Sequence, residues 1–331
     1  MTGVARRCRF SIVICTFNRA GPLRDALRTA LQQQADGRFD FEVLVVDNNS
    51  TDATRATVEE FITAGHRNLR YFFEGRQGKS FALNTALDAV SGSHYVIVDD
   101  DFLLPPDWLA RIFDGLCRYP DASFVGGKVL PEWSGTPPAW LTQEHWAAVA
   151  MADFGPTAFA TSEELQVCLL ACTFRVDDVR AVGGYDTRLG VRGRRIGGVE
   201  DLDLLRRLWK AGRTGVYLPD VAFLHRAEPE RLTKRYHRRW HRDHGRSHAI
   251  MRNPSTEEVP QLFGVPRHMY WEVLENLTFA VVRTLRGHAG AAFKAETRLW
   301  FIFGFVRERW TEGLTRLREP LGRAANRAAT P

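Results

Sequence analysis

Apolar runs and amphipathic segments alternate along residues 10 to 130 of this 331-residue chain. Buried-strand patterns occur at 10–15, 41–46, 69–73 and 95–98, with helical patterns between them at 22–34, 52–64 and 80–90. Strands that alternate with helices over short connections form a parallel sheet covered by helices. We therefore predict an α/β fold with a mostly parallel, Rossmann-like central sheet.

The rest of the chain shows a different pattern. The alternation is lost between residues 131 and 175, and we expect irregular structure there. Helical patterns return at 200–210, in a very basic segment at 231–250 and from about 269 onward, whereas 254–268 has the composition of a loop. We predict a main domain over residues 1–228 and a basic and amphipathic helical region over residues 229–331.

The composition of the chain indicates where the protein is located and what kind of partner it binds. Apolar residues make up 44% of the chain, no apolar run reaches the roughly 20 residues of a membrane span, and no leader-like segment opens the sequence. Five scattered cysteines without a CxxC pair indicate reduced thiols and a cytoplasmic protein. The net charge of +6 favours an anionic partner, such as a nucleotide, phospholipid head groups or nucleic acid.

Three acids, Asp99, Asp100 and Asp101, follow the strand pattern at 95–98. Ligands of parallel sheets bind at the carboxyl ends of strands. If the strand geometry continues, Asp99 and Asp101 lie on one face, where two carboxylates would suit Mg²⁺ or Mn²⁺. The alternative is a turn or capping cluster, because Asp is common in turns.

Polar residues also follow the strand pattern at 41–46. Asp47 could accept hydrogen bonds from a nucleobase, and Asn48 and Ser50 could hold a ribose or a phosphate. The alternative is an Asx turn and a helix cap. The later segment GRQGKS is no P-loop, since Phe73 stands where that motif needs its first glycine, but Lys79 at a helix start could neutralise a phosphate.

Two further acids, Glu200 and Asp201, stand at the start of the helical pattern at 200–210. Acids at this position favour the helix dipole, and a carboxylate here could also act as a general base. His225 follows the apolar stretch VAFL and could be a third metal ligand or a structural histidine.

These segments, taken in order, resemble the family 2 glycosyltransferases of GT-A fold. The resemblance covers about residues 10 to 226 and rests on the acidic triplet and on five segments: SIVICTFNR, VVDNNSTDAT, GKSFALNTAL, VGGYDTRLG and GGVEDLDLLRRL. It implies a GT-A fold followed by a helical C-terminal extension.

The resemblance also implies roles for single residues. Asp201 would be the catalytic base, with Glu200 as the second choice. The metal would bind to Asp101, Asp99 and His225. The nucleotide-sugar would contact Thr16, Asn18, Arg19, Asp47, Asn48, Lys79, Asn84, Asp99 and Asp100.

Three positions depart from the family pattern. The alanine-arginine-asparagine stretch reads Ala82-Leu83-Asn84, so Lys79 would replace the arginine contact. Where many members have Gly-Ala-Asn, this chain has Ala171-Cys172-Thr173, which removes an expected acceptor contact. The QxxRW frame of processive members reads YHRRW at 236–240, and without a membrane span we exclude a processive synthase.

The implied activity is that of an inverting glycosyltransferase dependent on Mn²⁺ or Mg²⁺. The donor would be a nucleoside-diphosphate sugar, and the acceptor a hydroxyl of a glycan, a polysaccharide or a lipid-linked glycan. The alternatives are a nucleotidyltransferase, which would release pyrophosphate, and an inactive sugar-nucleotide-binding scaffold. We expect no nucleic-acid partner, because no base-stacking motif accompanies the basic residues.

A peripheral position on the inner face of the membrane is a further hypothesis. Arg235, Arg238, Arg239 and Arg242 have the spacing of one helix stripe, which could meet an anionic membrane, the diphosphate or only solvent. Aromatic residues of the last helical segment could lie at a membrane interface or pack against the catalytic domain: Trp300, Phe301, Phe303, Phe305 and Trp310.

Overall fold

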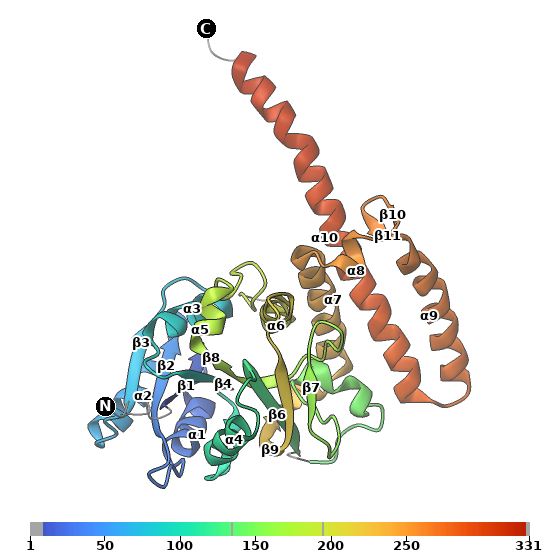
Figure 1. The fold of residues 1–331 in the computed structure, drawn as a ribbon. Helices are drawn as coiled ribbons and strands as arrows, with labels where there is room; N and C mark the ends of the chain where they lie inside the picture. The colour runs from blue at the N-terminus through green and yellow to red at the C-terminus, as the bar shows by residue number, and fades with distance from the viewer. Residues whose placement is uncertain (1–8, 134, 194, 329–331) are drawn as a thin grey trace. The chain divides into compact units, whose positions relative to one another are not determined.

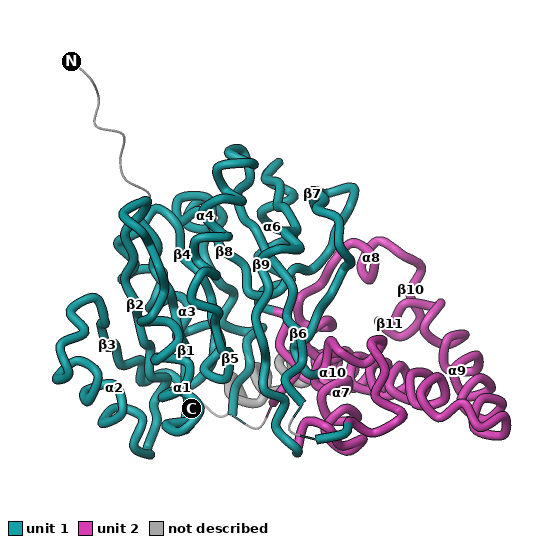
Figure 2. Tube along the Cα trace, turned by 90° about the horizontal axis from the view of Figure 1, so that it is seen from below, with its two compact units in different colours: residues 1–136, 149–193, 200–229 teal, residues 137–148, 194–199, 230–331 magenta. Residues whose placement is uncertain are grey.

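The computed structural model describes residues 9–133, 135–193 and 195–328, with side chains as far as residue 315. The expectation of no leader segment concerns the start of the chain, and residues 1–8 of that stretch lie outside these ranges. Two compact units emerge: unit 1 holds residues 1–136, 149–193 and 200–229, and unit 2 holds residues 137–148, 194–199 and 230–331 (Figure 2). A separate domain over 229–331 stays a prediction.

Unit 1 contains the predicted parallel sheet. Strands β1 (Arg9–Thr16), β2 (Asp40–Asp47), β3 (Leu69–Phe73) and β4 (His94–Asp99) pair in the order β3-β2-β1-β4, all parallel (Figure 1). Helices α1 (Ala20–Leu31), α2 (Thr54–Thr63) and α3 (Lys79–Ala89) connect them. The α/β prediction for this part of the chain is confirmed.

The sheet continues through strands that the sequence pattern did not indicate. Beyond β4 the order is β8 (Leu170–Arg175), β6 (Phe124–Trp133), β9 (Gly215–Ala227) and β5 (Phe102–Leu103), and β7 (Phe159–Thr161) pairs with β9. The prediction of irregular structure between 131 and 175 was therefore wrong for the end of β6, for β7 and for β8, whereas 135–142, 150–158 and 162–169 form no helix or named strand. Strand β8 pairs antiparallel with both β4 and β6, so tertiary pairing rather than local sequence makes it a strand.

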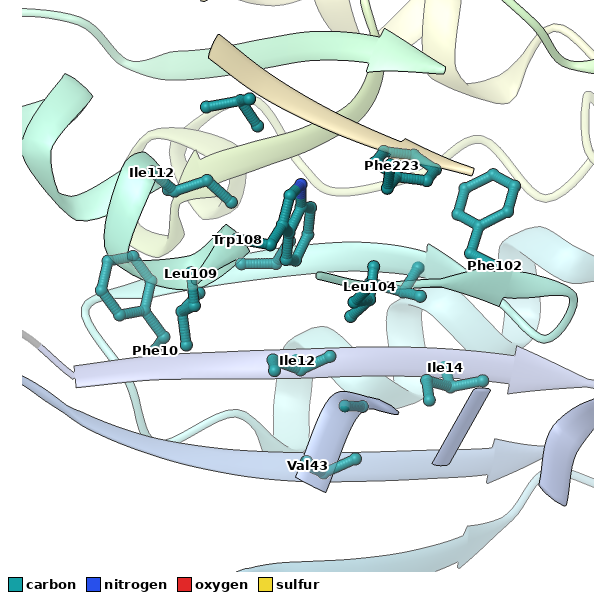
Figure 3. Close-up of a cluster of buried hydrophobic side chains, with 14 of the residues drawn as sticks. Phe10, Ile12, Ile14, Val43, Phe102, Leu104, Trp108, Leu109, Ile112 and Phe223 are labelled. Atoms are coloured by element: carbon teal, nitrogen blue, oxygen red, sulfur yellow. The ribbon is translucent and has the colours of Figure 1, made fainter. Parts of the chain in front are cut away.

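Helices cover both faces of this sheet, because alternate side chains of each strand point to opposite faces. On one face Phe10, Ile12 and Ile14 of β1 pack with Trp108 of helix α4 (Trp108–Arg118) and with Phe223 of β9 (Figure 3). The other face joins Val13 of β1 to residues of α3, of α5 (Val176–Ala181) and of α6 (Glu200–Lys210). The loops at the ends of the strands are therefore anchored to a sheet that is buried on both faces.

Unit 2 is mainly helical. Its long helices are α7 (Lys234–Met251), α9 (Arg267–Leu285) and α10 (Ala289–Ala328). The segment predicted as a loop at 254–268 contains the short helix α8 (Pro254–Glu257) and a small hairpin of β10 (Gln261–Leu262) and β11 (Val265–Pro266). No helix within the described ranges combines the length and the apolar character needed to cross a membrane.

Helices α7 and α10 touch through glycines. A Cβ atom at Gly245 would lie 2.0 Å from the carbonyl oxygen of Phe301, and one at Gly304 would lie 1.9 Å from that of Arg242. Two arginines of α7 also bind α10: Arg238 pairs with Glu296, and Arg246 pairs with Glu308. Part of the basic face of α7 therefore serves contacts within unit 2.

The aromatic residues of α10 divide into two groups. Phe305 is fully buried and Phe301 packs against the same apolar cluster, whereas Phe303 and Trp310 are about half exposed. The first group therefore packs within unit 2, and packing against the catalytic domain stays a prediction.

Candidate active site

Three strands of unit 1 end side by side at the predicted binding edge. In the parallel register Thr16 of β1 lies opposite Asp47 of β2, and Cys15 of β1 lies opposite Asp99 of β4. The predicted residues that follow these strands are therefore brought to one edge of the sheet. This is the edge at which open parallel sheets bind ligands.

Asp47 is held in place by two hydrogen bonds. It is 2% exposed; its Oδ1 accepts from the backbone N–H of Ser50 at 2.9 Å, and its Oδ2 accepts from the hydroxyl of Tyr71 at 2.9 Å. Burial raises the pKa of Tyr71, and the bond to Asp47 adds to the rise. Sequence reasoning missed Tyr71, because nothing in the strand pattern distinguishes it from the other aromatic residues of β3.

Asn48 organises the loop that leads into α3. Its Oδ1 accepts from the N–H of Gly78 at 2.7 Å, and its Nδ2 donates to the carbonyl of Arg76 at 2.7 Å. Gly78 has a φ of +141°, a conformation that favours glycine, and Lys79 follows it as the first residue of the helix. The amide of Asn48 thus holds the turn after which helix α3 begins at Lys79.

Asn18 links the loop after β1 to the loop after β2. Its Oδ1 accepts from the N–H of Thr51 at 2.7 Å, and its own N–H donates to the hydroxyl of Ser50 at 2.8 Å. Asn18 itself has a φ of +52°, which asparagine tolerates better than most residues. The two loops are therefore fastened to each other at the binding edge.

The acidic triplet does not follow the strand alternation. Strand β4 ends at Asp99, and Asp100 and Asp101 lie in a turn. The guanidinium of Arg19 binds both of the latter, with Nε 2.8 Å from Asp100 and Nη2 2.9 Å from Asp101. The strand geometry on which a shared face of Asp99 and Asp101 depended does not continue, because β4 ends two residues before Asp101.

Arg19 supplies the positive charge that compensates this pair. Its third nitrogen, Nη1, binds the carboxylate of Glu228 at 2.9 Å. The hydroxyl of Thr16 donates a hydrogen bond to Asp100 at 2.7 Å. Burial raises the pKa of Asp100 to about 6, although the charge of Arg19 opposes the rise. The sequence analysis did not predict a role for Glu228, because no motif distinguishes it from the other acidic residues of the chain.

His225 lies beside Asp101, as the predicted metal-ligand set requires. Phe102 pairs with His225 across β5 and β9, and the Nε2 of this fully buried histidine is 3.4 Å from Oδ2 of Asp101. Asp99 does not join them: its Oδ1 binds the ammonium of Lys79 at 2.9 Å. Among the described side chains, no three of His, Cys, Asp or Glu are arranged to hold a metal ion.

This donor set fits a hard divalent cation that a ligand completes. Mg²⁺ and similar ions are usually bound by one or two carboxylates together with substrate phosphates and water, rather than by a cage of protein atoms. Asp101 and His225 provide a carboxylate oxygen and an imidazole nitrogen 3.4 Å apart, and both groups occur as ligands of divalent metal ions. Asp99 is the member of the predicted set that would have to leave Lys79 to take part.

Glu200 and Asp201 begin helix α6 without the hydrogen bonds that hold the other acids. Glu200 is 4% exposed, and neither its Oε2 nor the Oδ1 of Asp201 has a hydrogen-bond partner among the residues that the structure describes. Burial raises the pKa of Glu200 to about 7; the charge of Asp201 adds to the rise, and that of Lys79 opposes it. Burial likewise raises the pKa of Asp201.

A short segment of unit 2 immediately precedes this pair in the chain, and helix α7 binds three of its successive residues. The carboxylate of Asp243 accepts from the N–H of Ile196 at 3.2 Å, and the hydroxyl of Ser247 donates to the carbonyl of Gly197 at 2.7 Å. The Nδ1 of His244 lies 3.3 Å from the carbonyl of Gly198. The backbone that leads into Glu200 is therefore fastened to a long helix.

Asn84 has a structural partner. Its amide donates to the carbonyl of Tyr185 at 2.9 Å and accepts from the N–H of Tyr185 at 2.8 Å. Both polar atoms of the side chain are thus used to fasten the GGYD segment to α3. A donor contact for Asn84 stays a prediction.

Comparisons with known proteins agree with this arrangement. The family described as Glycosyl transferase family 2 matches residues 11–175, and the one described as Glycosyl transferase family group 2 matches residues 94–305. The chain is 34% identical over 229 residues to the glycosyltransferase AglE of Haloferax volcanii, a match that covers 68% of this chain and 70% of that protein.

A second relative is more distant. The chain is 28% identical over 187 residues to the glucosyl-dolichyl phosphate glucuronosyltransferase of Haloferax volcanii. This match covers 56% of the chain and 58% of the relative, so the chain spans less than two thirds of that relative's length.

A solved structure shares the fold. The mannosyltransferase PcManGT of Pyrobaculum calidifontis, in complex with GDP-Man and Mn²⁺, has a TM-score of 0.61 at 20% identity, over 93% of this chain and 88% of that one. The predicted GT-A fold is confirmed.

Proposed function

Because the chain belongs to glycosyltransferase family 2 and is a glycosyltransferase, we propose that it moves a sugar from a nucleoside diphosphate to an acceptor hydroxyl with inversion. The acceptor hydroxyl attacks the anomeric carbon from the face opposite the diphosphate. The new glycosidic bond forms as the bond to the diphosphate breaks, and the hydroxyl proton passes to a carboxylate. A single displacement of this kind inverts the configuration at that carbon.

The observation that carries this proposal is the buried acid pair at the start of α6. A carboxylate works best as a general base when its pKa lies near the working pH. Burial raises the pKa of Glu200 to about 7 and raises that of Asp201 as well, and each has an oxygen without a hydrogen bond among the described residues. Both acids meet this condition, and because the family resemblance gives the role of base to Asp201, we assign the base to Asp201 and a supporting role to Glu200.

The donor-binding role is proposed for the residues of the sheet edge. Asp47 is fixed by a hydrogen bond within its own loop and Asn48 by one to the loop that leads into α3, and such rigid polar groups suit recognition of a nucleotide. Lys79 stands at the start of α3, where an ammonium and a helix N-terminus can both stabilise phosphate oxygens. Thr16, Asn18 and Arg19 complete the proposed donor side.

We propose Asp101 and His225 as the protein ligands of a divalent cation, either Mn²⁺ or Mg²⁺. A bound cation would act as a Lewis acid that stabilises the negative charge of the leaving diphosphate. The residues of the chain position this charge: Arg19 orients Asp101, and β5 and β9 hold His225 next to it. Asp99 is proposed to stay with Lys79 and to face the donor.

For the acceptor we propose a glycan, polysaccharide or lipid-linked hydroxyl. The glucuronosyltransferase relative is named for a glucosyl-dolichyl phosphate, which is a sugar on a lipid carrier. That name supports a lipid-linked acceptor of the same chemical class for this chain.

A donor screen tests the proposal. The full chain would be mixed with nucleoside-diphosphate sugars and candidate acceptors, with Mn²⁺, with Mg²⁺ and with chelator, and the released nucleotide would be identified. We expect a nucleoside diphosphate that appears only with cation, and a product whose anomeric configuration, read by NMR, is opposite to that of the donor. Release of pyrophosphate would instead identify a nucleotidyltransferase, and retained configuration would exclude the single displacement.

A further inference from the structure

Helix α9 exposes a continuous stripe of large apolar side chains. Its members are 49–82% exposed and follow each other at spacings of three or four residues, which places them on one face of the helix: Trp271, Leu274, Leu277, Val281 and Leu285. We call them the α9 stripe. Single exposed apolar residues are ordinary, but an ordered set of this size marks an interaction surface.

The opposite side of α9 is already used. Met269 is 3% exposed, and Val273 packs into the same apolar cluster as Ile302 and Phe305 of α10. The helix therefore has one apolar side for its own unit and a second apolar side that the described residues leave open. Near its start, the turn of the β10–β11 hairpin adds Phe263, which is 78% exposed.

The charge of this region is positive. Among residues 261–315, whose side chains the structure describes, seven lysines and arginines outnumber five acidic residues. On α9 and at its end, Arg267, Arg283 and Arg286 outnumber the two acids of the helix. Exposed Arg267 and Arg286 stand at the two ends of α9, and one of its two acids, Glu272, is bound by Arg298 at 2.5 Å. An apolar face within a cationic region is complementary to a surface of anionic lipid.

We propose that the α9 stripe and Phe263 dock unit 2 onto an anionic lipid bilayer. The apolar side chains would enter the boundary between head groups and acyl chains, while the arginines at the helix ends would meet lipid phosphates. The helix would lie in the plane of the membrane. A second copy of the chain is the less favourable occupant, since contact through this region would join two surfaces of the same positive excess.

Vesicle flotation of the full chain tests this docking. Vesicles of phosphatidylcholine alone and of phosphatidylcholine mixed with phosphatidylglycerol would be compared at low and high salt. We expect binding to the mixed vesicles at low salt, with a loss of about tenfold in partitioning for Leu274→Ser or Leu277→Ser. Arg286→Glu should weaken binding about fivefold or more, because one charge near the surface is removed and reversed.

Matched variants carry the same changes in unit 1. Ile62 and Leu165 are 42% and 51% exposed, and Ile62→Ser or Leu165→Ser should leave vesicle binding unchanged, as should Arg118→Glu. Fluorescence with brominated lipid gives a second readout. The 72% exposed Trp271 should be quenched, and Trp271→Phe should remove that quenched fraction.

Three results would overturn the docking proposal. They are absence of binding to anionic vesicles at low salt, equal loss of binding in the unit 1 variants, and a dimer in light scattering that Leu274→Ser converts to a monomer. None of these measurements uses a sugar donor, so the docking proposal and the proposed transferase chemistry fail independently.

Discussion

Two acid groups of unit 1 are stabilised in different ways. Asp100 and Asp101 are bound by one guanidinium, that of Arg19, and Asp100 also accepts from Thr16. Glu200 and Asp201 are compensated by the charge of Lys79, which the charge of Asp99 opposes, and the ammonium of Lys79 is itself bound to Asp99. The first pair is compensated by direct contacts, and the second is compensated at a distance.

This difference suits the two pairs to different roles, the first to binding of a metal ion and the second to proton transfer. A carboxylate in contact with a cation keeps its negative charge. A metal ion can then replace that cation as its partner, so such a carboxylate suits metal binding. A buried carboxylate without such contact keeps its proton to higher pH and can exchange it near neutrality. Asp100 lies between these cases, because burial raises its pKa to about 6 although Arg19 opposes the rise.

The largest effect is expected from Asp201→Asn. The amide cannot accept the hydroxyl proton, so kcat should fall by about 10²- to 10⁴-fold. The KM for the donor should change little, since the proposed donor contacts lie elsewhere. Steady-state kinetics on an acceptor found in the donor screen would measure both constants.

The same helix offers a control. Asp203 is two residues further on and forms an ion pair with Arg207 at 2.8 Å. Asp203→Asn should keep a kcat near that of the wild type. Full turnover of Asp201→Asn would move the role of base to Glu200 and would contradict our assignment.

Arg19→Ala tests the compensated pair. It leaves two nearly buried carboxylates facing each other, so we expect the free energy of unfolding at neutral pH to fall by on the order of 2 kcal/mol. The loss should shrink at mildly acidic pH, where the carboxyl groups take up protons. Urea unfolding at both pH values would measure it.

Added Mn²⁺ or Mg²⁺ sharpens this test. A divalent cation at the same carboxylates should stabilise Arg19→Ala more than the wild type, since it replaces a missing charge. Arg24→Ala, which removes an exposed pair with Glu60 on α1, should show no such difference. If cation stabilises the two variants equally, Asp101 is not a metal ligand.

Glu200→Gln tests the other pair through pH. The pKa of Glu200 is about 7 in the folded protein and lies above its ordinary value of 4.5, so the folded state binds more protons between these values. Wild-type stability should therefore fall as pH rises through this window, and Glu200→Gln should remove on the order of 2 kcal/mol of that fall.

The kinetic profile gives a second readout of the same variant. A limb of the kcat/KM profile that Glu200 sets should disappear in Glu200→Gln, because the amide does not titrate. An unchanged pH dependence of both unfolding and kcat/KM would show that Glu200 is not the titrating group.

The sequence predicted what depends on local pattern. The strands and helices between residues 10 and 98 follow from hydrophobic periodicity, and every predicted end lies within three residues of the observed one. The convergence of Asp47, Asp99 and their loops followed from the rule for parallel sheets. The neighbourhood of His225 and Asp101 was also expected, through the family resemblance.

What the sequence could not predict depends on long-range pairing. Strand β8 exists because β4 and β6 pair with it, and its own residues give a weak signal. Arg19 and Asp101 are 82 residues apart, so no local rule joins them. The end of β4 at Asp99 decided which acids share a partner, and the exact end of an element is the least predictable of its properties.

The smallest effect is expected at the segment that precedes the acid pair. Ser247→Ala removes the hydrogen bond to the carbonyl of Gly197 and leaves that carbonyl without this partner. Since a buried hydrogen bond contributes about 1 kcal/mol, we expect a loss of that size in the free energy of unfolding. If the segment positions Asp201, kcat should also fall by about fivefold while the KM for the donor stays constant. Ser255→Ala, in helix α8, is the matched change outside this segment and should leave kcat unaltered. A loss of stability without a change in kcat would limit Ser247 to folding and would show that Glu200 and Asp201 are positioned by α6 alone.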